Sequence, residues 1–161
     1  MISIVIPTFN EIRNISEIIN QLLKLDFSSD LEIIIVDDNS SDGTADKVRQ
    51  LVHNDKRIRL INRVGRSGLS SAIKEGCLCA SGELVVVMDA DGQHDPSYIR
   101  KALECIESSK VDIVIGSRFA IGSRIRGLSK SRERGSSLAN SLAVWVYMVT
   151  TVIYQTIWVD F

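Results

Sequence analysis

The sequence predicts an α/β domain in which a mostly parallel sheet is flanked by helices. Short apolar runs typical of buried strands alternate with segments whose apolar residues recur at helical spacing. Strands that alternate with helices of roughly 10–15 residues indicate βαβ units, which place their strands parallel. The length of 161 residues is enough for one well-buried core.

Each expected strand is a short apolar run. The strands are Ile2–Ile6, Ile33–Val36, Ile58–Ile61, Leu84–Met88 and Val111–Ile115. The first run is stopped by Pro7, and the fourth contains no polar residue. An entirely apolar strand in a parallel sheet is expected to be covered on both faces.

A helix is expected after each of the first four strands, because apolar residues there recur every three or four positions. These helices are Ile15–Leu23, Ala45–Val52, Leu69–Ala80 and a segment that ends near Ile106. The last one begins at Asp95-Pro96, where Asp suits the N-cap and Pro the first helical position.

The net charge bears on nucleic-acid binding, and the cysteines and the N-terminal sequence bear on cellular location. A net charge of −1 gives no general reason to expect nucleic-acid binding. The three cysteines have no ligand spacing, and nothing at the N-terminus is typical of a signal peptide. We therefore expect free thiols and a cytoplasmic location.

Polar clusters follow the expected strands at their carboxyl ends. They are Thr8–Glu11, Asp37-Asp38, Asp89–Asp91 and Ser117-Arg118. Ligands of open parallel sheets bind outside the carboxyl ends of the strands, so these clusters predict one site at that edge.

Asp89 and Asp91 stand one residue apart, directly after the most apolar strand. Two such carboxylates can share a hard divalent cation, with phosphate oxygens completing its shell and Gln93 adding a neutral oxygen. The alternative is a solvated acidic turn. The position after a buried strand favours the metal and diphosphate interpretation.

Asp37 and Asp38 leave the second strand together. One of them is able to accept hydrogen bonds from a base or ribose, and we favour this role for Asp38 and a structural role for Asp42. The loop Arg63–Leu69 is basic and contains glycine, which suits an anion but is a pattern of low specificity.

The C-terminal part combines a basic stretch with an uncharged one. Basic residues gather between Gly116 and Arg134, and no charged residue occurs from Gly135 to Val159. The uncharged stretch is long enough for a membrane span of ~20 residues but contains many Ser, Thr, Asn and Gln. It is better interpreted as an interfacial helix beside anionic lipid head groups.

Four motifs occur in a fixed order along the chain, namely Pro7–Glu11, Asp37–Thr44, Asp89–Pro96 and Gly116–Arg118. Together they resemble the motifs of family 2 glycosyltransferases, and most closely those of the polyprenol-phosphate group typified by dolichol-phosphate mannosyltransferases. Each is modestly specific alone, but four in the same order and spacing make the resemblance strong. It covers nearly the whole chain.

The resemblance implies a GT-A fold that binds a nucleoside-diphosphate sugar with Mg²⁺ or Mn²⁺. Nucleoside contacts would fall to Pro7, Phe9, Glu11, Val36 and Asp38, with Phe9 replacing the tyrosine often found there. Diphosphate and metal would be held by Asp89, Ala90, Asp91 and Gln93. Arg118 would bind phosphate, Arg134 the acceptor phosphate, and the catalytic set would be Asp89, Asp91 and Arg118.

The function implied is inverting transfer of a sugar, mannose or glucose, to a polyprenyl phosphate at the cytoplasmic face of a membrane. Members of the family continue beyond Phe161, so we expect a C-terminally truncated chain with a nucleotide-sugar-binding domain at 1–134 and an apolar, interfacial helical part at 135–161.

Three alternatives stay open. The acceptor could be a sugar hydroxyl, or the chain could be an inactive donor-binding fragment. Leu84–Gly92 also resembles the first motif of haloacid-dehalogenase-type phosphatases, in which Asp89 would be the nucleophile and Asp91 the general acid.

Overall fold

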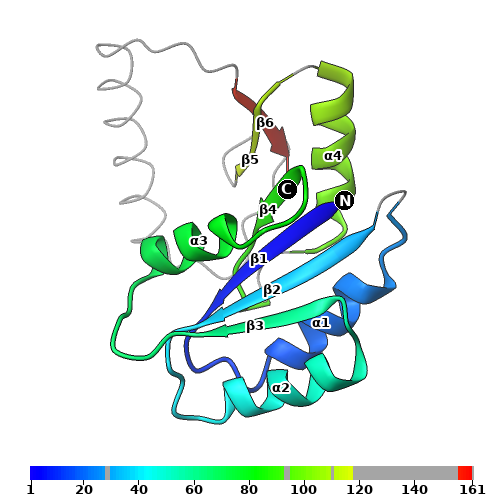
Figure 1. The fold of residues 1–161 in the computed structure, drawn as a ribbon. Coiled ribbons are helices and arrows are strands. Elements are labelled where there is room, and N and C mark those ends of the chain that lie inside the picture. Colours follow the sequence, from blue (N-terminus) through cyan, green and yellow to red (C-terminus); the bar gives the residue numbers. More distant parts are fainter. Residues whose placement is uncertain (28–29, 93–94, 110, 118–155, 161) are drawn as a thin grey trace, which may run out of the picture. The chain divides into compact units, whose positions relative to one another are not determined.

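The computed structural model describes residues 1–27, 30–92, 95–109, 111–117 and 156–160 (Figure 1). The chain divides into two compact units, Met1–Ser97 and Tyr98–Phe161. The predicted boundary at 134/135 and the expected helix up to residue 155 lie outside the described residues.

The first unit is a parallel sheet covered by three helices, as the alternating pattern predicts. Its strand order is β3-β2-β1-β4. Helices α1 and α2 lie on one side of the sheet and α3 on the other (Figure 1). This is expected for right-handed crossovers, because the chain adds β2 and β3 on one side of β1 and then returns to add β4 on the other side. The strands are β1 (Ile2–Thr8), β2 (Leu31–Asp37), β3 (Ile58–Asn62) and β4 (Leu84–Val87), and the helices are α1 (Ile15–Lys24), α2 (Thr44–Asn54) and α3 (Leu69–Leu78).

The core of this unit is centred on β1 and β2, which are buried along their whole length. Helix α3 approaches them at Gly76, where an added Cβ would come within 2.3 Å of Val5 Cγ1 and 3.0 Å of Val36 Cγ2. The absence of a side chain at Gly76 therefore fixes how closely α3 packs on the sheet.

Strand β1 continues through Pro7 instead of ending before it. The carbonyl of Val5 accepts from Met88 on the β4 side, and that of Thr8 accepts from Asp38 on the β2 side. Residues two apart on a strand direct their backbone groups to the same side, so the N–H that Pro7 lacks would point, like the carbonyl of Val5, toward β4. The pairing of β4 with β1 ends at Val5, before Pro7 is reached.

Strand β4 differs from the expectation that both of its faces are covered. Val85 and Val87 are 41% and 43% exposed. Strand β4 is the edge strand of this four-stranded sheet, and helix α3 packs on the neighbouring strands β1 and β2.

The second unit contains α4 (Tyr98–Ser109), β5 (Ile113–Ser117) and β6 (Thr156–Asp160). The two strands pair in parallel, with Ile113 opposite Thr156. Residues 156–160 thus form a strand where the sequence suggested the end of an apolar helical part, and their run of Thr, Ile, Trp and Val is typical of strands. Among the residues that the structure describes, none of the helices has the length and apolar character that a membrane span requires.

Candidate active site

The carboxyl edge of the first unit's sheet brings together the residues that follow β1, β2 and β4. Thr8 pairs with Asp37 in register, and the Asp38 amide donates to the Thr8 carbonyl at 2.9 Å. Phe9 and Asp38 therefore leave adjacent strands at the same level. Phe9 is 63% exposed, which leaves its ring available for stacking.

The loops after β1 and β2 turn at equivalent positions and bind each other. Asn10 and Asn39 both adopt left-handed backbone conformations, with φ of 59° and 56°. The backbone amide of Asn10 donates to Ser40 Oγ at 2.8 Å, and the backbone amide of Ser41 donates to the side-chain Oδ1 of Asn10 at 3.0 Å. Asn tolerates this conformation better than most residues, so the paired turns are encoded locally.

Asp42 adds a second set of contacts between the same loops. Its carboxylate accepts from the Ile12 amide at 3.0 Å and from the Thr44 hydroxyl at 2.6 Å, and the Glu11 amide donates to Thr44 Oγ1 at 2.9 Å. Slight desolvation raises the pKa of Asp42, but the hydrogen bonds from Thr44 and Ile12 outweigh it and hold the pKa below its ordinary value. These contacts support the structural role expected for Asp42.

The two adjacent acids after β2 have different environments. Asp37 is fully buried and accepts from the Thr8 hydroxyl at 3.1 Å, from the Ser40 amide at 2.9 Å and from the Ser40 hydroxyl at 2.6 Å. Asp37 thus anchors the loop. Asp38 instead retains 10% side-chain exposure and is bound by Arg63 and the Gly68 amide.

The other nucleoside residues implied by the resemblance are placed differently from one another. Glu11 is half-buried and its carboxylate accepts from Asn14 Nδ2 at 2.9 Å. Pro7 and Val36 are buried, and Val36 packs with Val5 and Ala72 in the core. The side chains of Pro7 and Val36 therefore lie in the interior of the unit, whereas the side chain of Phe9 is exposed at the carboxyl edge of the sheet.

Asp89, Ala90 and Asp91 follow β4 at the same edge of the sheet. The Met88 amide donates to the Val5 carbonyl at 3.2 Å, which holds the end of β4 beside β1. Ala90 is buried, Asp89 is half-buried and Asp91 is exposed. Carboxylate oxygens such as those of Asp89 and Asp91 are ligands of the kind that Mg²⁺ and Mn²⁺ prefer. The part of the chain that the structure describes contains no group of three or more His, Cys, Asp or Glu that would hold a metal by itself.

Three of the expected site residues lie outside the described residues. They are Gln93, Arg118 and Arg134. Conversely, the sequence missed the part played by Arg63, which appeared only as the first residue of a basic loop. Its position directly after β3, beside the end of β2, was the feature of the sequence that could have indicated a contact with Asp38.

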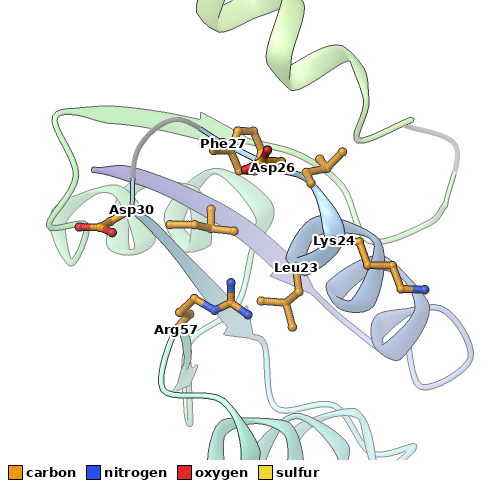
Figure 2. A pocket seen from close by; sticks show the side chains of 8 residues that line it. Leu23, Lys24, Asp26, Phe27, Asp30 and Arg57 are labelled. Atoms are coloured by element: carbon orange, nitrogen blue, oxygen red, sulfur yellow. The ribbon is translucent and has the colours of Figure 1, made fainter.

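A hollow of about 360 Å³ lies at the opposite edge of the sheet (Figure 2). Its lining includes Leu31, the first residue of β2, and Arg57, which directly precedes β3. Figure 2 places Lys24, Phe27 and Asp30 around the same hollow. Because it opens at the amino ends of the strands, it is separate from the candidate site.

Comparison with known proteins identifies dolichol-phosphate mannosyltransferases as relatives of this chain. The chain is 40% identical over 124 residues to a dolichol-phosphate mannosyltransferase of Pyrococcus furiosus, covering 77% of this chain and 35% of that protein. It is 35% identical over 123 residues to the Saccharomyces cerevisiae dolichol-phosphate mannosyltransferase, covering 74% of this chain and 45% of that protein. The chain therefore spans less than half the length of these relatives.

Among solved structures, the mannosyltransferase PcManGT of Pyrobaculum calidifontis, in complex with GDP-Man and Mn²⁺, superposes with a TM-score of 0.61. The two sequences are 28% identical, and the match covers 68% of this chain and 33% of that one. The architecture is accordingly the GT-A fold.

Residues 3–156 match the glycosyl transferase family 2, which is nearly the full length of the chain. The match includes the polar segments after β1, β2 and β4, and it removes the basis for the phosphatase alternative. The chain belongs to glycosyl transferase family 2 and is similar to dolichol-phosphate mannosyltransferases.

Proposed function

We propose that this chain is the donor-binding part of a metal-dependent, inverting glycosyltransferase that moves a hexose from a nucleoside-diphosphate sugar to a polyprenyl phosphate. The observation that carries the proposal is the shared edge at which Phe9 and Asp38 stand beside the Asp89–Asp91 turn. Mannose is the favoured sugar, because the curated relatives are mannosyltransferases and PcManGT was solved with GDP-Man.

The nucleoside would occupy the Phe9 and Asp38 side of this edge. The exposed Phe9 ring supplies a stacking surface, and the Asp38 carboxylate supplies an acceptor for N–H or O–H groups. The reciprocal contacts between the β1–α1 and β2–α2 loops hold both groups before a ligand arrives, which reduces the ordering cost of binding.

The diphosphate would lie toward Asp89 and Asp91. These two carboxylates, together with Gln93, would hold Mg²⁺ or Mn²⁺. When bound, the metal would offset the charge that develops on the departing diphosphate. We assign Arg118 to the same phosphates and Arg134 to the acceptor phosphate.

A phosphate acceptor is already anionic near pH 7, so its attack requires no strong general base. A site rich in carboxylates and arginines suits this chemistry. A sugar hydroxyl acceptor would instead require a carboxylate to take its proton. We place the reaction at the cytoplasmic face of a membrane, where the basic stretch from Arg118 to Arg134 would meet anionic head groups.

The experiment that tests the proposal is a thermal-shift panel of GDP-mannose, UDP-glucose and dTDP-glucose, each with and without Mn²⁺. A ligand that binds the native state raises its apparent stability. The expected result is a shift that requires both Mn²⁺ and one of the nucleotide sugars. Absence of a shift with every sugar would contradict donor binding by this chain.

Transfer itself is tested separately, with radiolabelled GDP-mannose and a polyprenyl phosphate in detergent. Formation of a lipid-soluble labelled product would support the acceptor assignment. Donor binding without product would favour the alternative of a donor-binding fragment.

A further inference from the structure

Arg63 is the largest of the fully buried side chains among the described residues, with 1% exposure. It directly follows β3, and its amide donates to the Asp37 carbonyl at 2.8 Å. A buried guanidinium is stable only when its charge and its N–H groups find partners. Its partners therefore indicate why the chain keeps a cation inside this edge of the sheet.

The guanidinium of Arg63 contacts three separate segments. Its Nη1 donates to Asp38 Oδ1 at 2.5 Å and to the Gly68 carbonyl at 3.3 Å. Its Nη2 donates to Ser71 Oγ at 2.5 Å, and Nε lies 3.2 Å from Glu75 Oε2, an ion pair without hydrogen-bond geometry. One planar group thus joins the end of β2, the loop after β3 and helix α3.

The Asp38 carboxylate is consequently fixed through both of its oxygens. Oδ1 is bound by Arg63, and Oδ2 accepts from the Gly68 amide at 2.7 Å. Gly68 has a φ of 119°, a conformation that a side chain would strain. An ionised carboxylate has about four acceptor sites, so the two contacts leave acceptor capacity for a ligand.

We propose that Arg63 is a positioning residue for nucleoside binding, which acts by holding the Asp38 carboxylate in a fixed orientation as an obligate hydrogen-bond acceptor. The inference rests on the proposed contact between Asp38 and the nucleoside. With 1% exposure and four protein contacts, Arg63 itself reaches the ligand only through Asp38.

The test measures the affinity of the 161-residue chain for two probes by calorimetry in the presence of Mn²⁺. GDP engages the base side and the diphosphate side of the site, whereas inorganic pyrophosphate engages only the latter. The informative variant is Arg63→Lys, because an ammonium keeps the charge but cannot maintain the planar fork of contacts. The expected result is a loss of GDP affinity of at least about tenfold, with pyrophosphate affinity unchanged.

A matched control is Arg59→Lys. Arg59 lies on β3 itself and pairs with a buried acid, Glu32, at 2.9 Å, near the amino ends of the strands. This variant is expected to lower thermal stability without changing the affinity for either probe. An equal loss of GDP affinity in both lysine variants would overturn the positioning role.

A double-mutant cycle with Asp38→Asn separates positioning from direct contact. If Arg63 acts through Asp38, adding Arg63→Lys to the Asp38→Asn variant causes no further loss of GDP affinity. A further loss of about tenfold in that double variant would overturn the inference in favour of a direct contact between Arg63 and the nucleotide.

If Arg63→Lys does not fold, Ser71→Ala decides the question, because it removes one partner of the guanidinium from an exposed position on α3. The expected result is a loss of GDP affinity of roughly two- to fivefold, the effect of a weakened hydrogen bond, and unchanged GDP affinity would overturn the inference.

If the unchanged chain binds neither probe, the proposed function fails. If the unchanged chain binds GDP and the variants bind it equally well, only the positioning role fails.

Discussion

The Oδ1 atom of Asn10 accepts the Ser41 amide hydrogen at 3.0 Å, which ties the loop that carries Phe9 to the loop that carries Asp38. Both partners lie at the surface, so the contact is not a consequence of core packing. It places a restraint directly beside the proposed nucleoside site.

Replacing Asn10 therefore affects stability and binding together. Asn10→Ala loses the acceptor and places alanine at a φ of 59°, and it is expected to lower the free energy of unfolding by roughly 1–2 kcal/mol. Asn10→Gly relieves the backbone strain and loses only the acceptor. Urea denaturation should rank the wild type above the glycine variant and the glycine variant above the alanine variant.

Asn39→Gly is the matched control, because Asn39 has a φ of 56° and an exposed side chain. It should leave GDP affinity within about twofold of the wild type, whereas both Asn10 variants lower it. Equal effects at the two positions would show that the Asn10 side chain does not hold the site.

Gly76 sets the distance between α3 and the sheet. A Cβ there would meet Val5 Cγ1 at 2.3 Å, so Gly76→Ala forces the helix outward and should cost about 1–3 kcal/mol of unfolding free energy. The same helix carries Ser71 and Glu75, so GDP affinity should fall as well. Lys74→Ala, on the exposed side of α3, serves as the control. Wild-type stability for Gly76→Ala by urea denaturation would contradict the close packing.

Glu32 joins three strands and a loop at the amino edge of the sheet. Its carboxylate accepts from the Ser3 hydroxyl at 2.5 Å, the Ser81 amide at 2.6 Å and Arg59 at 2.9 Å. Burial raises the pKa of Glu32, and these hydrogen bonds together outweigh burial, so the pKa lies below its ordinary value.

A lowered carboxyl pKa gives the sign of the pH dependence. The ionised Glu32 stabilises the fold above the pKa of the unfolded chain, about 4.3, and this contribution is lost as the pH falls through the lower pKa of the folded state. Glu32→Gln should therefore cost about 1–3 kcal/mol at pH 7 and progressively less below pH ~4. Urea denaturation at both pH values, with the exposed Glu83→Gln as control, measures this difference. A deficit that stays constant down to about pH 3 would contradict this linkage.

The sequence was sufficient to predict the fold, because its signals are local. Apolar runs and helical spacing indicated the order of β1 to β4 and α1 to α3, and the parallel sheet and its superposition on PcManGT confirm the fold class. The strand after α4 was also predicted, although the structure begins it at Ile113 instead of Val111.

The features that sequence reasoning missed depend on tertiary neighbours. Val85 and Val87 are exposed on a strand that lies beside the strands covered by α3, a position that an apolar run cannot reveal. Residues 156–160 belong to an uncharged stretch without clear periodicity, and pairing with β5 makes them a strand. The burial of Arg63 depends on partners of its guanidinium up to 25 residues away in sequence, so the sequence indicated only a basic loop that suits an anion.

The most direct test of the proposed function is calorimetric titration of the chain with GDP-mannose in Mn²⁺ and in EDTA, repeated for Asp91→Ala and for Asp95→Asn. Asp95 is a nearby exposed acid whose carboxylate accepts from the Ser97 amide at 2.9 Å, and it serves as the control. We predict Mn²⁺-dependent binding that is abolished in Asp91→Ala and retained in Asp95→Asn. Unchanged Mn²⁺-dependent affinity in Asp91→Ala would contradict the metal–diphosphate role of the Asp89–Asp91 turn.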